Sequence, residues 1–411
     1  MIKTKKLSFS MEEVDKKLGF VEPNFYRTER EELSVTMGIE DVLPKRDVTS
    51  KNIWALYDAL VTDYPDRIER NDIVIDKVYD KNGNQLFDED GNPITFTNYE
   101  YVISTGEYNT AGVFYGSPRM DEDIKKPKYL ITSSDGFEKP PIIAIYRFVR
   151  DVLEGRNVPE QFREGCIISV LPVAVPYSVD TLYKIENKPN YALGANYDEA
   201  LSVDGVFDED GTLKDKNAKY TDYVLCKFNE NHVLVGRNFN YKWKPHSYLE
   251  IDKVPMTHGT DHETEKETKA IVKWLEANKG ADLFLDCHTG APLNEVVQFY
   301  GTAEDDTVLK KIAMRGMNRV IPFWRDVIRY PKDIIFYSAV GQKTWSVDGS
   351  MHAYAKAEIG IPALTLEFSV QTASTTDEFE KDKYAITAES VASEAEVIGN
   401  VLIEFYERSS Y

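Results

Sequence analysis

The sequence has few cysteines and no long apolar run. Its three cysteines, Cys166, Cys226 and Cys287, form no Cys-x-x-Cys pair, which argues against a disulfide framework and against a thiolate zinc site. The basic N-terminus lacks the apolar stretch that follows in a signal peptide, and no run of about 18 apolar residues could span a membrane. We therefore expect a cytoplasmic protein, or one that leaves the cell by a route other than secretion.

Positive charge is also scarce. Lysine and arginine total 49 against 69 aspartates and glutamates, which gives a formal net charge of −20. This balance opposes sustained contact with phosphate backbones and anionic membranes, so we expect neither nucleic acid nor a membrane as a partner. The compact motifs GxGxxG, the P-loop, HExxH and GxSxG are absent as well, so the residues that could carry chemistry are dispersed along the chain.

The chain divides into a charged N-terminal segment and a long patterned region. Residues 1–49 show one short periodic patch, and we predict an N-terminal arm that could dock to an assembly partner. Residues 49–65 begin with a Thr/Ser N-cap, place apolar residues at helical spacing and stop at a proline, which predicts a helix. Residues 72–104 alternate apolar and polar residues around Asn-Gly and Asp-Gly signals, which predicts an inserted β-ribbon.

From residue 128 the pattern is strand, loop and helix, repeated. Short apolar runs alternate with amphipathic segments, the runs at 128–132, 166–174, 281–290 and 361–370 and the segments at 141–155 and 263–280. This alternation predicts one α/β domain over residues 50–411, with a mixed, mostly parallel sheet and helices on both of its faces. In such sheets the chemistry gathers at the carboxyl ends of the strands.

Three ionisable residues fall at or near strand ends, namely Asp135, His288 and Glu367. A second carboxylate, Glu138, follows Asp135 by three residues at the start of a helix. Taken alone, this acidic pair could be a solvated helix start, and His288 could be a buried, hydrogen-bonded histidine. Glu367 is harder to dismiss, because an ionisable group inside an apolar strand requires a partner or a site.

Six segments together resemble the zinc carboxypeptidase family of the carboxypeptidase A type. They are "IWALYDALVTDYPDR", "SSDGFEKPP", "VGRNFNYKW", "TEKET", "FLDCHTG" and "GIPALTLEFS". The segments follow the family's order, and the resemblance covers roughly residues 50–411. It implies a sheet of about eight strands and a metal-dependent hydrolase.

The resemblance also implies roles for individual residues. Asp135, Glu138 and His288 would hold one zinc ion and leave an open position for water, as catalytic zinc sites do. Glu367 would be the general base, and Arg237 would bind the substrate's carboxylate with its forked donors. The expected substrate is therefore a peptide or an amino-acid conjugate with a free carboxylate.

The chain departs from the family's pattern at several positions. Asp135 stands where the family has its first histidine ligand, and an oxygen-rich shell shifts the preference toward harder ions such as manganese. Gly236 replaces the asparagine that precedes the substrate-binding arginine. No arginine lies between Arg163 and Arg237, where the family has the residue that stabilises the oxyanion. Candidates to replace it are Lys184, Lys188, Arg315, Arg319, Arg325 and Arg329.

Residues 341–360 resemble the family's substrate-covering loop. Trp345 lies near the register of that loop's tyrosine, and Tyr337 and Tyr354 are alternatives. Met351 falls near the position that lines the specificity pocket, which hints at an apolar substrate side chain. We therefore predict Trp345 and Met351 as substrate-binding residues beside Arg237.

These observations predict a hydrolase that cleaves a peptide or amide bond next to a free carboxylate. Two alternatives stay open. A catalytically weak or inert carboxypeptidase-like binding or structural module would explain the missing arginine, and an acyl-amino-acid deacylase would explain the loss of the asparagine at position 236. The presence of both Asp135 and Glu367 favours the hydrolase, because a binding module needs neither a metal ligand nor a base.

Overall fold

A computed structural model gives the fold of the central and C-terminal parts of the chain. It describes residues 48–80, 82–104, 126–136, 138–186, 228–231, 233–244, 246–248, 255–291, 295–298, 309, 312–313, 315–317, 335–338, 349–369 and 388–409. The predicted N-terminal arm lies outside these residues except for Val48 and Thr49, so the arm and its assembly partner stay predictions.

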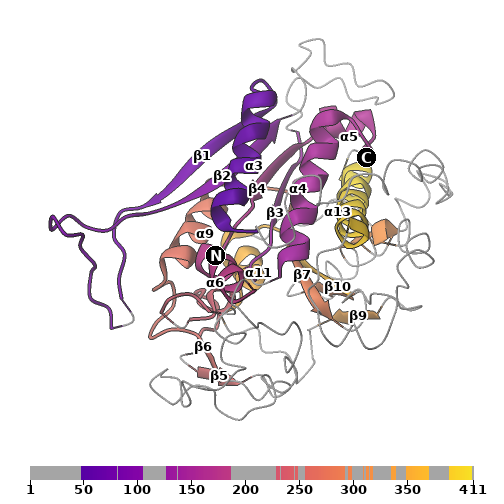
Figure 1. Cartoon of the computed structure of the whole chain (residues 1–411). Helices are drawn as coiled ribbons and strands as arrows, with labels where there is room; N and C mark the ends of the chain where they lie inside the picture. The colour runs from indigo at the N-terminus through magenta and orange to yellow at the C-terminus, as the bar shows by residue number, and fades with distance from the viewer. Residues whose placement is uncertain are drawn as a thin grey trace.

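Eight strands of the described residues form one mixed sheet, in the order β1-β2-β4-β3-β7-β10-β8-β9 (Figure 1). They are β1 (Ile68–Ile75), β2 (Phe96–Ser104), β3 (Lys128–Thr132), β4 (Ile167–Leu171), β7 (Leu283–Ala291), β8 (Glu295–Gln298), β9 (Ile335–Ser338) and β10 (Ala363–Ser369). The four central strands, β4, β3, β7 and β10, run parallel to one another. β2 is antiparallel to both β1 and β4, and β8 is antiparallel to β10. The prediction of a mixed, mostly parallel sheet of about eight strands is confirmed.

Helices cover both faces of this sheet. They are α3 (Ser50–Asp63), α4 (Lys139–Glu154), α5 (Glu160–Gly165), α6 (Pro176–Glu186), α9 (Lys266–Ala277), α11 (Met351–Tyr354) and α13 (Ala388–Ser409), with the 3-10 turn η2 (Val235–Arg237) and the π-helical turn η3 (Ala355–Ile359). α3, α4, α5 and α13 pack on one face, and α9 and α11 pack on the other (Figure 1). A separate two-stranded sheet pairs β5 (His246–Tyr248) with β6 (Pro255–Thr257).

Local sequence explains where α3 begins and where α4 begins and ends. The Thr49 side chain accepts a hydrogen bond from the Asn52 amide at 3.1 Å, which caps α3. α4 begins with two prolines, whose missing N–H groups have no partner in a first helical turn anyway. It ends at Gly155, which takes the left-handed conformation of a C-cap at φ 71°.

The alternation of side chains along β7 and β10 decides which face carries the polar residues. Leu285 and Leu366 belong to the core cluster beneath α4 and α13, whereas Phe284 and Ala363 belong to the cluster on the α9 and α11 side. Since side chains alternate between the faces of a strand, every second residue of each strand faces α9 and α11. By this alternation Asp286 and His288 of β7, and Thr365 and Glu367 of β10, fall on that side.

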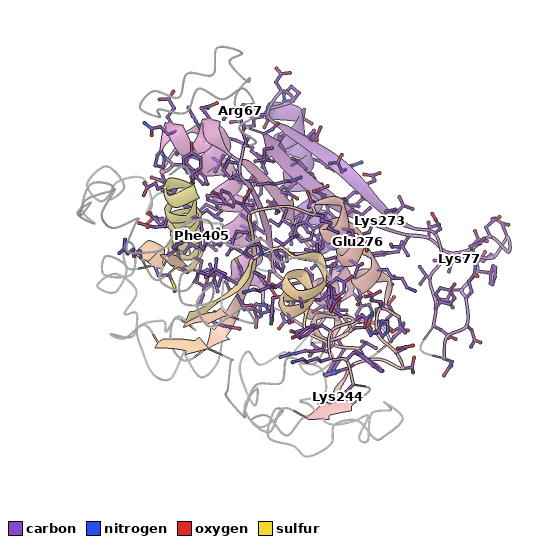
Figure 2. The ribbon with its side chains drawn as sticks, turned by 180° about the vertical axis from the view of Figure 1, so that it is seen from behind. Arg67, Lys77, Lys244, Lys273, Glu276 and Phe405 are labelled. Atoms are coloured by element: carbon purple, nitrogen blue, oxygen red, sulfur yellow. The ribbon has the colours of Figure 1, made fainter. Side chains whose placement is uncertain are left out.

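The ribbon made by β1 and β2 lies at one edge of the sheet. The two strands pair from Ile68↔Ile103 to Ile75↔Phe96, so the paired ribbon begins four residues before the predicted start at 72. Its continuation projects away from the body, with Lys77 on the projection and Lys273 of α9 on the body near its base (Figures 1 and 2). Lys273 Nζ donates to the Val74 carbonyl at 3.1 Å, which ties the ribbon to α9. None of the described helices is long and apolar enough to cross a membrane.

Candidate metal centre and active site

Two parallel strands bring the three predicted ligands together. β3 ends at Thr132, and the short loop that follows carries Asp135 and Glu138 to the start of α4. The Glu138 amide donates to the Asp135 carbonyl at 2.9 Å, so the loop turns between the two carboxylates. The neighbouring strand β7 contributes His288. One ligand atom of each residue lies within 4.8 Å of the others.

The separations between these atoms fit a single metal ion. His288 Nδ1 is 3.1 Å from Glu138 Oε2 and 3.5 Å from Asp135 Oδ2. Ligands at about 2.0–2.2 Å from a tetrahedral zinc ion lie roughly 3.3–3.6 Å from each other. Carboxylate oxygen and imidazole nitrogen are both donors that zinc accepts. The three residues could therefore hold zinc, with a position left open.

Gly136 explains how the loop can carry both carboxylates. A Cβ atom at this position would lie 2.7 Å from the Val175 carbonyl oxygen and 2.8 Å from Ser178 Cβ. A larger residue would push the loop away from the start of α6. The glycine therefore keeps Asp135 and Glu138 close to the sheet.

Glu367 lies beside the ligand trio on the next strand. Its Cα is the register partner of His288 across the parallel pair β7 and β10. Burial raises the pKa of the Glu367 carboxyl, the charge of His288 lowers it, and the carboxylates of Glu138 and Asp135 raise it again, to about 8. Glu367 therefore interacts electrostatically with all three candidate ligands.

Arg237 approaches the trio from the turn η2. The neighbouring Gly236 lies against the loop of the ligands, since a Cβ built there would be 3.7 Å from Ser134 Oγ and 4.0 Å from Asp135 Oδ1. Gly349, just before α11, holds this turn from the other side: its Cβ position would overlap the Arg237 carbonyl oxygen. Arg237 itself is partly exposed, and its charge helps to lower the pKa of His352 beside the site.

Sequence reasoning missed the residues that surround His288 on its inner side. Asp286 Oδ2 lies 2.8 Å from His288 Nε2. Asp286 also accepts hydrogen bonds from the amide and the hydroxyl of Ser134, at 3.0 and 2.9 Å. A second histidine, His352 of α11, places Nδ1 4.0 Å from the same carboxylate and 3.2 Å from Thr365 Oγ1. The strand alternation could have found Asp286, because it is two residues before His288.

Burial and neighbouring charges shift the pKa values of His288, Asp286 and His352 in different directions. Burial lowers the pKa of His288, but the carboxylates of Asp286 and Glu138 outweigh burial and hold that pKa well above its usual range. Burial raises the pKa of Asp286, but the two histidines outweigh it and hold the pKa well below its usual range. Burial lowers the pKa of His352 to about 4, so His352 is neutral at pH 7.

The structure describes few of the side chains that were predicted as further substrate contacts. Trp345 lies outside the described residues, and of Tyr337 only the backbone, in β9, is described. Met351 is buried, at 1% exposure, in the core cluster between α9 and α11. The specificity role predicted for Met351 therefore stays a prediction, and it would require substrate to reach that cluster. Among the candidate oxyanion residues, Arg315 is described and partly exposed; the side chains of the other five lie outside the described part.

Comparisons with known proteins agree with this geometry. Residues 228–393 match the family model described as zinc carboxypeptidase. Curated protein sequences give no match. Among solved structures, the chain is similar to carboxypeptidase A from Helicoverpa armigera, with a TM-score of 0.56 and 16% identity, over 97% of this chain and 85% of that one.

Two further structures show the same likeness. One is thrombin activatable fibrinolysis inhibitor, with a TM-score of 0.51 and 14% identity over 92% of this chain and 80% of that one. The other is the bovine thrombin-activatable fibrinolysis inhibitor in complex with tick carboxypeptidase inhibitor, with a TM-score of 0.51 and 12% identity over 88% of this chain and 98% of that one. At these identities the likeness shows a shared fold. Asp135 and Glu138 precede the matched segment, whereas Arg237, His288 and Glu367 lie within it.

Proposed function

We infer that this protein is a metal-dependent hydrolase, because residues 228–393 match the zinc carboxypeptidase family model and the ligand trio lies together. The proposed reaction cleaves a peptide or amide bond next to a free carboxylate. The observation that carries the proposal is the meeting of Asp135, Glu138 and His288 within 4.8 Å, beside Glu367. A fold alone does not define an activity, but a ligand trio with a neighbouring carboxylate is a site with a defined chemistry.

The proposed ion would be held by the two carboxylates and by the Nδ1 atom of His288. When bound there, zinc would polarise the scissile carbonyl and make a bound water more acidic. Two carboxylates and a neutral imidazole cancel the charge of a divalent ion, so this shell acidifies the water less than a shell with one carboxylate and two imidazoles. An oxygen-rich shell also suits manganese, so the metal is part of the proposal and is open to test.

Glu367 would move the proton in this reaction. Its carboxylate accepts a proton from the attacking water, whose oxygen forms the new bond to the carbonyl carbon. The same carboxyl then returns the proton to the nitrogen of the leaving amine as the carbon–nitrogen bond breaks. Its place beside His288 in the strand register suits this exchange.

Arg237 would orient the substrate. Its planar guanidinium can donate two parallel hydrogen bonds to a carboxylate, a geometry that lysine cannot offer. Gly236 has no side chain that could orient a carboxylate, and a Cβ there would make ordinary contacts, at 3.7 Å from Ser134 Oγ and 4.0 Å from Asp135 Oδ1. The absence of an asparagine donor at this position favours an acyl-amino acid over a peptide, and the deacylase is therefore kept as a variant of the proposal.

The experiment that tests the proposal separates the base from the ligands. We expect Glu367→Gln to slow the hydrolysis of acyl-amino acids and of peptides with a free carboxyl terminus by at least about a hundredfold, because a glutamine cannot accept the proton. The variant should keep its bound metal, since a base is not needed to hold the ion. The measurements are hydrolysis rates and metal content of proteins purified without chelator.

A matched control is Glu265→Gln, which changes a buried glutamate at the start of α9 that accepts hydrogen bonds from Asn229 and Asn231. This variant should hydrolyse substrate like the wild type. Equal activity of Glu367→Gln and wild type would remove Glu367 from the mechanism. A wild-type protein that binds metal and substrate but hydrolyses neither class would favour the inert binding module instead.

A further inference from the structure

The inner side of His288 carries a buried hydrogen-bonded group that the proposed reaction does not use. From it we propose that Asp286 is a positioning residue, which fixes the ring of His288 with Nε2 protonated and Nδ1 facing Asp135 and Glu138. This proposal rests on the proposed function in one respect, because it assumes that Asp135, Glu138 and His288 bind a metal ion. The orientation of the ring is a property of the chain itself.

The two ring nitrogens of His288 face opposite ways. Nδ1 lies 3.1 Å from Glu138 Oε2, on the side of the ligand trio, and Nε2 lies 2.8 Å from Asp286 Oδ2. A neutral imidazole has one protonated nitrogen and one lone pair, and only the lone pair can bind a metal. A carboxylate that accepts a hydrogen bond from Nε2–H therefore leaves Nδ1 as the nitrogen whose lone pair can bind the ion.

Asp286 is itself held in place by its neighbours. Its side chain is almost fully buried, and Ser134 donates to both of its oxygens, through the amide to Oδ1 and through the hydroxyl to Oδ2. Ser134 directly precedes Asp135. The carboxylate thus connects the loop that carries two candidate ligands with the strand that carries the third.

The negative charge of Asp286 matters as well as its shape. An asparagine could turn its amide group toward Nε2 and donate to it, which would move the imidazole proton to Nδ1, the atom needed for the ion. The same carboxylate oxygen, Oδ2, also lies 4.0 Å from His352 Nδ1. Loss of this negative charge would therefore change the electrostatic environment of both His288 and His352.

The test compares Asp286→Asn with the wild type and with a control, Asp151→Asn. Asp151 is also a buried aspartate, but it lies on α4 and outside the site. We expect Asp286→Asn to weaken zinc binding by about 10- to 100-fold in calorimetric titrations with zinc chloride. Proton NMR of the metal-free proteins should show a downfield, slowly exchanging Hε2 proton of His288 in the wild type and in Asp151→Asn, and its loss in Asp286→Asn.

Each other outcome also decides the question. Unchanged zinc affinity together with a retained Hε2 signal in Asp286→Asn would overturn the proposal, and so would equal losses in both aspartate variants, which would reflect stability alone. If Asp286→Asn does not fold, Ser134→Ala replaces it, with an expected loss of about fivefold in zinc affinity, the equivalent of one net hydrogen bond. No loss in Ser134→Ala would then count against the proposal.

The readouts also separate this proposal from the proposed function. If the wild type binds no zinc, the metal-dependent hydrolase fails, but a protected Hε2 proton that disappears in Asp286→Asn still supports the positioning role. If zinc binds and the protected proton is absent from the wild type, the hydrolase stands and the positioning role fails.

Discussion

At the scale of single residues, Asp135 distinguishes this site from the pattern that the sequence resembles. It supplies an oxygen where the family has a nitrogen, and it places a second negative charge next to Glu138. Both carboxylates reach the same nitrogen of His288, at 3.5 and 3.1 Å. The exchange of one side chain therefore alters the charge of the shell without changing the number of ligands.

We expect Asp135→His to bind zinc more tightly relative to manganese, because imidazole suits zinc and oxygen suits harder ions. Asp135→Ala should lose zinc affinity by at least about tenfold, since two protein ligands would remain. Hydrolysis by Asp135→His need not rise, because the missing oxyanion arginine is a separate deficit. Zinc and manganese titrations of the three proteins measure these differences.

Identical zinc affinities of all three proteins would mean that Asp135 is a solvated helix-start residue. A useful control is Asp261→Ala, which removes an exposed aspartate in the loop before α9. That variant should bind zinc like the wild type.

The sequence could predict the ligand trio because each member lies in a recognisable segment next to a strand end. It could not predict the distances that bring them together. Strand alternation places Asp286 on the same face as His288, but it does not predict the contact between their side chains. Asp286 resembles an ordinary polar residue of a buried strand until its neighbour is known. His352 lies in a stretch whose position relative to β7 depends on the whole sheet.

At the scale of elements, the turn η2 and the start of α11 hold each other through backbone contacts. The Phe239 amide donates to the Gly349 carbonyl at 2.9 Å, and the Gly349 amide donates to the Tyr241 carbonyl at 2.7 Å. Gly349 has φ +69°, in the left-handed region that favours glycine. Its missing Cβ is what lets the Arg237 carbonyl approach.

Gly349→Ala should therefore displace Arg237. We expect KM for a substrate with a free carboxylate to rise roughly tenfold to a hundredfold, the equivalent of one lost hydrogen bond to a charged group, with a smaller change in kcat. Steady-state kinetics would measure the separate changes in KM and kcat.

Gly83→Ala is the matched control for that variant. Gly83 also has positive φ, at +78°, but a Cβ there would meet nothing within 4 Å. It lies on the projecting ribbon, so the same backbone strain should leave KM unchanged. A similar rise in KM for both variants would mean that strain alone, and not the contact with Arg237, sets the effect.

Periodicity predicted three of the long helices, but neither α13, the longest described helix, nor the short α11. The helices α3, α4 and α9 carry caps, prolines and an amphipathic pattern, all of which are local signals. By contrast, α11 spans only Met351–Tyr354 in a segment that resembles a loop. So short a helix is marginal by itself, and it depends on packing against the sheet and α9.

At the scale of the whole molecule, the site concentrates acid groups in a protein that already carries a net charge of −20. Asp135, Glu138, Asp286 and Glu367 surround His288. The burial of Glu367 among these carboxylates couples its protonation to the stability of the fold.

We expect the metal-free protein to lose stability as the pH rises from 4.5 to about 8. Glu367 has a folded pKa raised from 4.5 to about 8, so between these values the folded state keeps a proton that the unfolded chain has lost. Its contribution to stability is fully present below pH 4.5 and is lost as pH rises to about 8. Thermal melting in the presence of a chelator, from pH 5 to pH 8, would follow this change.

Comparison with Glu367→Gln isolates the contribution, because His288 and His352 also titrate differently in the folded state. The raised pKa of His288 adds a loss of stability above pH 6.5, and the lowered pKa of His352 adds a gain between about pH 4 and 6.5. The glutamine variant should therefore show a flatter decline than the wild type. Parallel melting curves of the two proteins would contradict the assignment.

The order of strands in the sheet has a consequence for how the protein is made. β3 pairs with β7 in the register Tyr129↔Leu283, so neighbours in the sheet are separated by more than 150 residues along the chain. Such distant pairings form slowly, because a long loop must close before they gain any contact. During synthesis Asp135 and Glu138 leave the ribosome long before His288 exists. The nascent chain can therefore capture an ion with all three ligands only after its two halves have met, which makes assembly of the site one of the last events of folding.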